Sequence, residues 1–213
     1  MSVLGELQPN KVFQYFEEIC AIPHGSRNLQ QISDYLVDFA KAHGLKYRQD
    51  EDLNVIIWKD GSKGYEDSDP VILQGHMDMV AVKESDCDKD MEKEGLDLEI
   101  DGDYILAKGT TLGGDDGIAV AYTLAVLDDE EMAHPPIEAI FTVNEEIGML
   151  GAATIDVSDL KGRLFMNMDS EDEGVFTVSC AGGASVICKI PYETETVNAS
   201  VIEIKMDGFT GGH

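Results

Sequence analysis

The chain has 213 residues, 43% of them hydrophobic and 27% charged, which is enough to bury one core and the beginning of a second domain. Asp and Glu number 42 against 15 Lys and Arg, so the formal net charge is −27. Because binding to phosphates requires clustered cations, we expect neither nucleic acid nor an anionic membrane as a partner.

The amino terminus carries no targeting signal that we recognise. MSVLGELQPNKVF lacks a basic stretch followed by an apolar run, and no segment approaches the roughly 20 apolar residues of a membrane span. The four cysteines show neither CxxC spacing nor the density of a disulfide scaffold. We therefore expect free thiols and a cytoplasmic protein.

Two amphipathic helices are predicted first. Pro9 stands where the first would begin, the second runs from about Asn28, and Gly44 is placed to end it. Each has one apolar face: Val12, Phe13, Phe16, Ile19 and Cys20 in the first, and Leu29, Ile32, Leu36 and Phe39 in the second.

Strands and helices then alternate. Residues 53–58, 71–73, 137–143 and 164–168 are predicted strands, the last two buried, and residues 84–102 an excursion or edge hairpin. Gly113-Gly114-Asp115-Asp116-Gly117 opens a helix with Ile118, Ala121, Tyr122, Ala125 and Val126 on one face. This order indicates an α/β layer fold with a mostly parallel mixed sheet.

The pattern changes after about Cys180. Residues 184–191 and 200–206 alternate as strands do, with no helix between them. We therefore divide the chain into an α/β domain of residues 1–180 and the beginning of an α+β domain, residues 181–213.

Polar residues of ligand type stand where the apolar runs end. In open parallel sheets ligands bind outside the carboxyl ends of the strands, so these side chains are expected to converge. His76 and Asp78, Glu145 and Glu146, and Asp169 stand at the ends of three such runs. Asp115 precedes a predicted helix and can project into the same crevice.

Such a cluster requires compensation, because several carboxylates close together repel in a low dielectric. Mixed imidazole and carboxylate ligands suit zinc, with manganese or cobalt as alternatives, and a carboxylate can bridge two metals. A lone His-x-Asp, Gly-Gly-Asp-Asp-Gly or Glu-Glu is usually a surface loop, a turn or a solvated face. Four such segments, each following a buried run or opening a helix, favour a metal site.

These motifs, in this order, resemble those of the aminoacylase and carboxypeptidase-like zinc peptidases. They are His76-Met77-Asp78 and residues 113–117, 144–148 and 167–169. Residues 22–27, 110–114 and 169–174 are similar, more narrowly, to the aminoacyl-histidine dipeptidases. The resemblance implies a three-layer zinc-peptidase catalytic domain over residues 1–180, with a truncated lid domain over residues 181–213.

The resemblance also implies metal-dependent hydrolysis of dipeptides, Xaa-His and related, at a two-zinc site. It implies a cis peptide between Asp115 and Asp116. His76 and Asp169 would bind the first zinc, Glu146 would bind the second, and Asp115 would bridge the two. Asp78 would orient the imidazole of His76, and Glu145 would act as the general base.

Two departures from the family pattern bear on activity. Asp116 stands where the dipeptidases commonly have Asn, and nothing in the chain matches the histidine that completes their second zinc. His213, in Gly-Gly-His, resembles a lid motif that binds substrate. We therefore expect an N-terminal fragment that binds at most one zinc well and is weakly active or inactive.

Two alternatives stay open. An aminoacylase or deacetylase-type amidohydrolase would use the same metal site, and lid residues would distinguish it. A catalytically dead metal-binding fragment is the other, although a pure metal-binding module has no need of a base such as Glu145. The expected partner is a small peptide substrate; the intact enzyme is expected to be a homodimer, and the fragment to self-associate.

Overall fold

The computed structural model describes residues 2–170, 174–180, 182, 186–196, 198, 200 and 202–206. The chain divides into two compact units, residues 1–172 and residues 173–213. The helices and strands of the described residues all lie in the first unit. The assignment of the two units to a catalytic domain and a lid remains a prediction.

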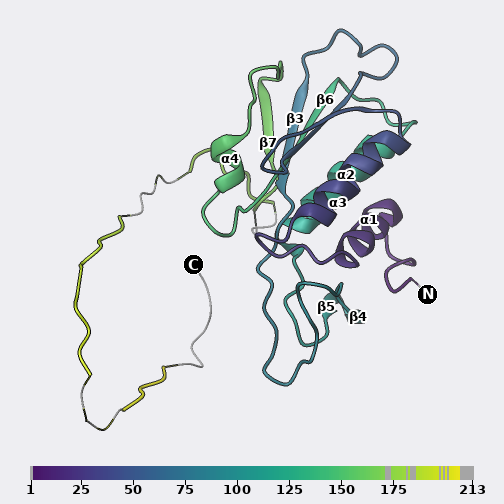
Figure 1. Ribbon diagram of the computed structural model, residues 1–213. Helices are drawn as coiled ribbons and strands as arrows, with labels where there is room; N and C mark the ends of the chain where they lie inside the picture. The colour runs from purple at the N-terminus through teal and green to yellow at the C-terminus, as the bar shows by residue number, and fades with distance from the viewer. Residues whose placement is uncertain are drawn as a thin grey trace. The chain divides into compact units, whose positions relative to one another are not determined.

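The first unit is built on a five-stranded sheet with the order β1-β2-β6-β3-β7 (Figure 1). Its strands are β1 (Lys46–Gln49), β2 (Val55–Lys59), β3 (Val71–His76), β6 (Ile137–Thr142) and β7 (Leu164–Asn167). β3 pairs in parallel with both β6 and β7, whereas the pairs β1–β2 and β2–β6 are antiparallel. The α/β fold and the mixed sheet are therefore confirmed, with the parallel part confined to β6, β3 and β7.

A separate two-stranded sheet pairs β4 (Leu98–Asp101) with β5 (Tyr104–Ala107). β4 lies within residues 84–102, the polar stretch predicted to be an excursion or edge hairpin, and β5 follows directly after it. Gly102, between the two strands, has φ +60°, a conformation that glycine adopts at little cost and that suits a tight turn.

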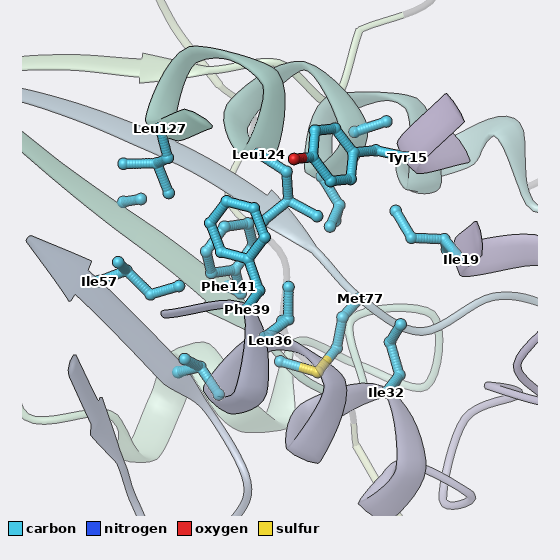
Figure 2. Packing of buried hydrophobic residues seen from close by; sticks show 14 of the residues in the cluster. Tyr15, Ile19, Ile32, Leu36, Phe39, Ile57, Met77, Leu124, Leu127 and Phe141 are labelled. Atoms are coloured by element: carbon cyan, nitrogen blue, oxygen red, sulfur yellow. The ribbon is translucent and has the colours of Figure 1, made fainter. Parts of the chain in front are cut away.

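Three helices lie together beside one face of the sheet (Figure 1). They are α1 (Asn10–Cys20), α2 (Gln30–Ala42) and α3 (Gly114–Asp128). Figure 2 shows their apolar side chains gathered with those of the strands into one core. Within it the rings of Tyr15 and Phe39 meet edge to face, with centroids 5.5 Å apart. The apolar faces predicted for the first two helices pack in this core.

The opposite face has a smaller core of Ile56, Ile72 and Ile140. Ile155 and Leu160, just after α4 (Leu150–Thr154), pack against it. This segment forms the third layer, and it covers the middle of the sheet.

β7 forms where a strand was predicted, but its burial was predicted wrongly. Leu164 is 61% exposed, Phe165 55% and Met166 44%. β7 is the last strand in the sheet order, so β3 is its only neighbour in the sheet of the described residues. An apolar run identifies a strand, but a neighbour on each side and on each face is what buries it.

The two strands predicted in the second unit are wrong for the residues that the structure describes there. Residues 186–191 and 202–206 form no strand, and side chains such as Ile187 and Ile190 are at least 80% exposed. Alternation can stabilise a strand only when a sheet partner is present. His213 lies outside the described residues. None of the helices in the described part of the chain is both long and apolar enough to cross a bilayer.

Candidate metal centre

His76, the last residue of β3, occupies the middle of the site and is 1% exposed. Side chains alternate along extended backbone, so Met77 enters the helix-side core while His76 and Asp78 face away from it. The Nδ1 atom of His76 lies 2.9 Å from the backbone oxygen of Asp78. A carbonyl oxygen can only accept, so Nδ1 carries a proton and Nε2 is the nitrogen turned toward Asp115, 3.0 Å from its Oδ1.

Two consecutive aspartates approach His76 from different sides. Asp115 is half exposed and contacts the imidazole, whereas Asp116 is 2% exposed and its Oδ2 accepts the backbone N–H of His76 at 3.2 Å. The peptide between them is cis, as predicted. Gly113 has φ +68°, and a Cβ there would lie 2.8 Å from the Sδ atom of Met79, so glycine is required where the chain enters α3.

The loop after β6 carries the two glutamates. Its backbone is closed by hydrogen bonds from Met149 N–H to Glu145 O (2.8 Å) and from Gly151 N–H to Val143 O (2.9 Å). The backbone N–H of Glu145 also donates to Asp78 Oδ1 at 3.0 Å. The loop is thereby attached to the residue that contacts the imidazole.

The ligand atoms gather in two overlapping groups. Those of His76, Asp115 and Glu146 all lie within 4.8 Å of one another, and so do those of His76, Glu145 and Asp169. Asp169 reaches the site because Met168 N–H donates to Gln74 O (3.2 Å), which continues the pairing of β7 with β3. Every metal ligand predicted from the sequence is therefore in a group that includes His76.

The electrostatics of the site fit a cation. Burial favours neutral His76, but the hydrogen bond that Asp78 accepts from it and the charges of Asp116 and Asp78 outweigh burial and raise the pKa of His76 to about 10. Burial raises the pKa of Glu145 and Glu146, and the charges of nearby carboxylates raise it further. Burial likewise raises the pKa of Asp116 to about 7. A divalent cation would relieve the repulsion that protons otherwise offset.

Asp78 differs from these carboxylates in keeping a lowered pKa. Burial opposes its charge, but hydrogen bonds from His76, from the Glu145 N–H and from the Ser26 hydroxyl outweigh burial. It is 1% exposed, and the donors at both of its oxygens favour the anion beside the imidazole.

Two cavities flank the ligand atoms. One of about 230 Å³ is lined by Asp115, Asp116 and Asp169, and one of about 250 Å³ by Glu145 and Asp169 with apolar side chains such as Phe165. A larger cavity, of about 620 Å³, lies at the opposite ends of the parallel strands, beside Pro70 and Pro136. None of the predicted site residues lines it.

Sequence reasoning missed three residues that hold the site together: Ser26, Asn54 and Asp116. Ser26 belongs to the 22–27 motif, which carried the resemblance but was given no role. Asn54 is 1% exposed, and its side-chain oxygen accepts the Val143 N–H at 3.1 Å. In the sequence only one feature pointed to it, a single amide residue next to an apolar strand. Asp116 was noted only as a departure from the family pattern.

The chain is similar to known peptidases. No family model matches it. It is 39% identical to the cytosol non-specific dipeptidase of Escherichia coli over 215 residues, 100% of this chain and 44% of that protein. The aminoacylhistidine dipeptidase structure from Vibrio alginolyticus is 42% identical, with a TM-score of 0.78 over 80% of this chain and 35% of its own. A tripeptidase from Staphylococcus aureus shares the fold. It is 24% identical, with a TM-score of 0.65 over 79% of this chain and 45% of its own. The chain spans less than half the length of these relatives.

Proposed function

The chain is related over its whole length to the cytosol non-specific dipeptidases, and from this premise we propose that it contributes a divalent-metal site to the hydrolysis of dipeptides. One observation carries the proposal. Side chains from the ends of β3, β6 and β7 and from the start of α3 meet around one buried imidazole. Convergence of one histidine with several carboxylates is the ligand chemistry of catalytic zinc.

The proposed ligands follow the family assignment. His76, Asp115 and Asp169 would hold a first zinc, and Asp115 and Glu146 a second, with manganese or cobalt as alternatives. Bound metal would supply acidification of a water molecule and polarisation of the scissile carbonyl. Asp78 would orient His76 through its backbone oxygen, 2.9 Å from Nδ1, and its carboxylate Oδ1, 3.5 Å from the same nitrogen, would polarise the imidazole.

Glu145 is the proposed general base. Its Oε2 lies 4.0 Å from Nε2 of His76, beside the proposed metal position, and its side chain is 30% exposed. A carboxylate with a raised pKa is suited to take a proton from water and return it to the leaving amine. The largely apolar cavity next to Glu145 gives room for a substrate side chain.

The proposed substrates are dipeptides, including those with a C-terminal histidine. The support is the relatives' own names, a non-specific dipeptidase and an aminoacylhistidine dipeptidase. The name of the first relative supports the proposal of a cytosolic location. A homodimer of the whole protein remains a proposal from the family resemblance alone. A role of His213 in substrate binding remains a proposal from the motif alone.

Metal analysis tests the site itself. After dialysis against zinc, the 213-residue chain is expected to retain about one zinc, because His76, Asp115 and Asp169 supply three protein ligands. His76→Ala and Asp169→Asn should each lose it, whereas the exposed Asp86→Asn should not. The assignment would be contradicted if the wild-type chain retained no zinc after dialysis, or if His76→Ala retained it.

Activity is tested in a longer context, because the chain spans 44% of the E. coli relative. A chimera in which residues 1–213 replace the matching part of that relative should hydrolyse Ala-His, and Glu145→Gln should abolish the hydrolysis. N-acetyl amino acids serve as the comparison substrate for an amidohydrolase. A folded, zinc-loaded chimera that cleaves only the N-acetyl amino acids, or that keeps its activity in Glu145→Gln, would refute the dipeptidase proposal.

A further inference from the structure

The segment between α1 and α2 lies against the end of β3. Met79 N–H donates to His24 O and Ser26 N–H donates to Met79 O, both at 3.2 Å, and Gly25 pairs with Met79 as a parallel bridge. A Cβ on Gly25 would lie 2.6 Å from the Cβ of Ala81, so the close approach requires glycine. This segment is thus attached through backbone to the extension of the strand that carries His76.

The side chain of Ser26 reaches the buried carboxylate of the site. Its hydroxyl donates to Asp78 Oδ2 at 2.8 Å. The other oxygen, Oδ1, accepts the Glu145 N–H at 3.0 Å and lies 3.5 Å from His76 Nδ1. The carboxylate therefore has a donor at each end, and its rotation about Cβ–Cγ is fixed by both.

A second contact joins the same segment to the glutamate loop. The backbone N–H of Arg27 donates to Asn144 Oδ1 at 2.8 Å. Arg27 and Asn144 have φ of +72° and +53°, a region that only a few per cent of non-glycine residues occupy. The segment thus contacts the site at two places, at Asp78 and at Asn144, which directly precedes Glu145.

We propose that Ser26 is a positioning residue, whose hydroxyl holds Asp78 so that one carboxylate oxygen serves both His76 and Glu145. Without this hydroxyl, Oδ2 of a 1% exposed carboxylate loses its donor, and rotation toward another donor becomes favourable. Such rotation turns Oδ1 away from the Glu145 N–H and from His76. The loss would loosen the ligand and the proposed base together.

The inference rests on the proposed function for its zinc readout alone. Partners in the second coordination sphere typically change metal affinity by 10–100-fold. Ser26 acts through such a partner, so we expect Ser26→Ala to weaken zinc binding by roughly tenfold, at the lower end of that range. Ser26→Thr, which keeps the hydroxyl, should restore most of the affinity.

A double-mutant cycle separates positioning from general stability. In an Asp78→Ala background, Ser26→Ala should have no further effect on zinc affinity. Ser33→Ala is the matched control, because this buried serine donates to Leu53 O at 2.7 Å in the α2–β2 region and no contact links it to Asp78. It should lower stability and leave zinc affinity unchanged.

The metal-free chain gives an independent readout. By NMR, hydrogen exchange at the Glu145 amide should quicken in Ser26→Ala relative to the amides of β6, and not in Ser26→Thr or Ser33→Ala. Unchanged relative exchange at Glu145, or an equal loss of zinc affinity with and without Asp78, would overturn the inference. A wild-type chain that binds no zinc would contradict the proposed function, while the exchange result still decides the role of Ser26.

Discussion

The carboxylate of Asp78 accepts the backbone N–H of Glu145, so the residue that contacts the imidazole also holds the loop bearing the proposed base. The two residues are far apart in sequence and are joined by a 3.0 Å hydrogen bond. Any change at Asp78 therefore affects both the proposed ligand His76 and the proposed base.

Asp78→Ala is expected to lower zinc affinity by about 10–100-fold, because it removes the carboxylate 3.5 Å from His76 Nδ1 and with it the acceptor of the Glu145 N–H. Isothermal titration with zinc measures the change, with the exposed Asp52→Asn as control. Zinc affinity within a factor of two of wild type would show that Asp78 does not orient the ligand.

Asn54→Ala should lower the free energy of unfolding by about 2–3 kcal/mol, because it leaves buried groups without partners. The Asn54 amide donates to Asp50 Oδ2 (2.8 Å) and Gly151 O (3.3 Å), and its oxygen accepts the Val143 N–H. Urea unfolding measures the loss. The exposed Asn10→Ala, which removes one hydrogen bond to Gly5 O, should cost far less. Equal costs for the two variants would be evidence against a structural role for Asn54.

The pH dependence of stability should reflect Asp128, the last residue of α3. Its carboxylate lies 2.6 Å from Lys11 Nζ and 3.0 Å from His43 Nε2, which joins three helical segments. Burial opposes its charge, but hydrogen bonds from Lys11 and Tyr15 outweigh burial, so the pKa of Asp128 is lowered.

The sign follows from proton binding. A lowered folded-state pKa means that the unfolded chain binds the proton first, so the stabilisation is present above the unfolded pKa of about 3.9 and disappears as pH falls through the folded value. Asp128→Asn should cost up to about 1 kcal/mol at pH 6, because the pair is partly solvated. The cost should shrink as pH falls below the unfolded value. Melting temperatures across pH 2–6 check this, with the exposed Asp38→Asn as control, and a difference independent of pH would contradict it.

Thiol labelling should distinguish the cysteines. Cys20 is 1% exposed, and burial, followed by the charge of Glu17, raises its pKa to about 12. Cys180 and Cys188 are exposed, and Cys87 is intermediate. At pH 8 a disulfide reagent should modify Cys180 and Cys188 rapidly and Cys20 only after unfolding, since the thiolate is the reactive form. Mass spectrometry after a timed quench shows the order, and early modification of Cys20 would contradict its burial.

The exposed edge strand should promote self-association of the 213-residue chain. Leu164, Phe165 and Met166 leave apolar surface on both faces of β7. Phe165→Lys should reduce any concentration-dependent increase in mass seen by sedimentation, whereas Tyr104→Lys, a change at a still more exposed aromatic on the separate hairpin, should not. Identical sedimentation of wild type and Phe165→Lys would exclude this surface.

Much of the fold could be predicted, because the spacing of apolar residues identifies the helices and strands and the polar residues after them mark the strand ends. His76 ends β3 and Asp169 follows β7, in agreement with the strand ends predicted from the apolar runs before them. The face of α3 was predicted less well. Tyr122 is 44% exposed, whereas Val120, Leu124 and Leu127 are buried, because a mostly apolar helix has no single face that the sequence marks.

The contacts that orient the site could not be predicted. Ser26 meets Asp78 only because the α1–α2 segment lies beside Met79, and Asn54 meets Val143 only because β2 pairs with β6. A single serine or asparagine has no periodicity, and its partner is set by tertiary packing. The same holds for Asp116, whose carboxyl turns to the backbone of β3 rather than to solvent.

The strand order has a consequence for how the centre is made. β3 lies between β6 and β7, both of which follow it in the chain, and Asp169 comes after β7. The ligand set is therefore complete only after the last strand has docked onto β3, a non-local pairing that must first overcome the entropy of closing a long loop. Uptake of a metal by the full proposed ligand set would therefore fall at the end of folding, and a spectroscopic metal such as cobalt would report the arrival of β7 in real time.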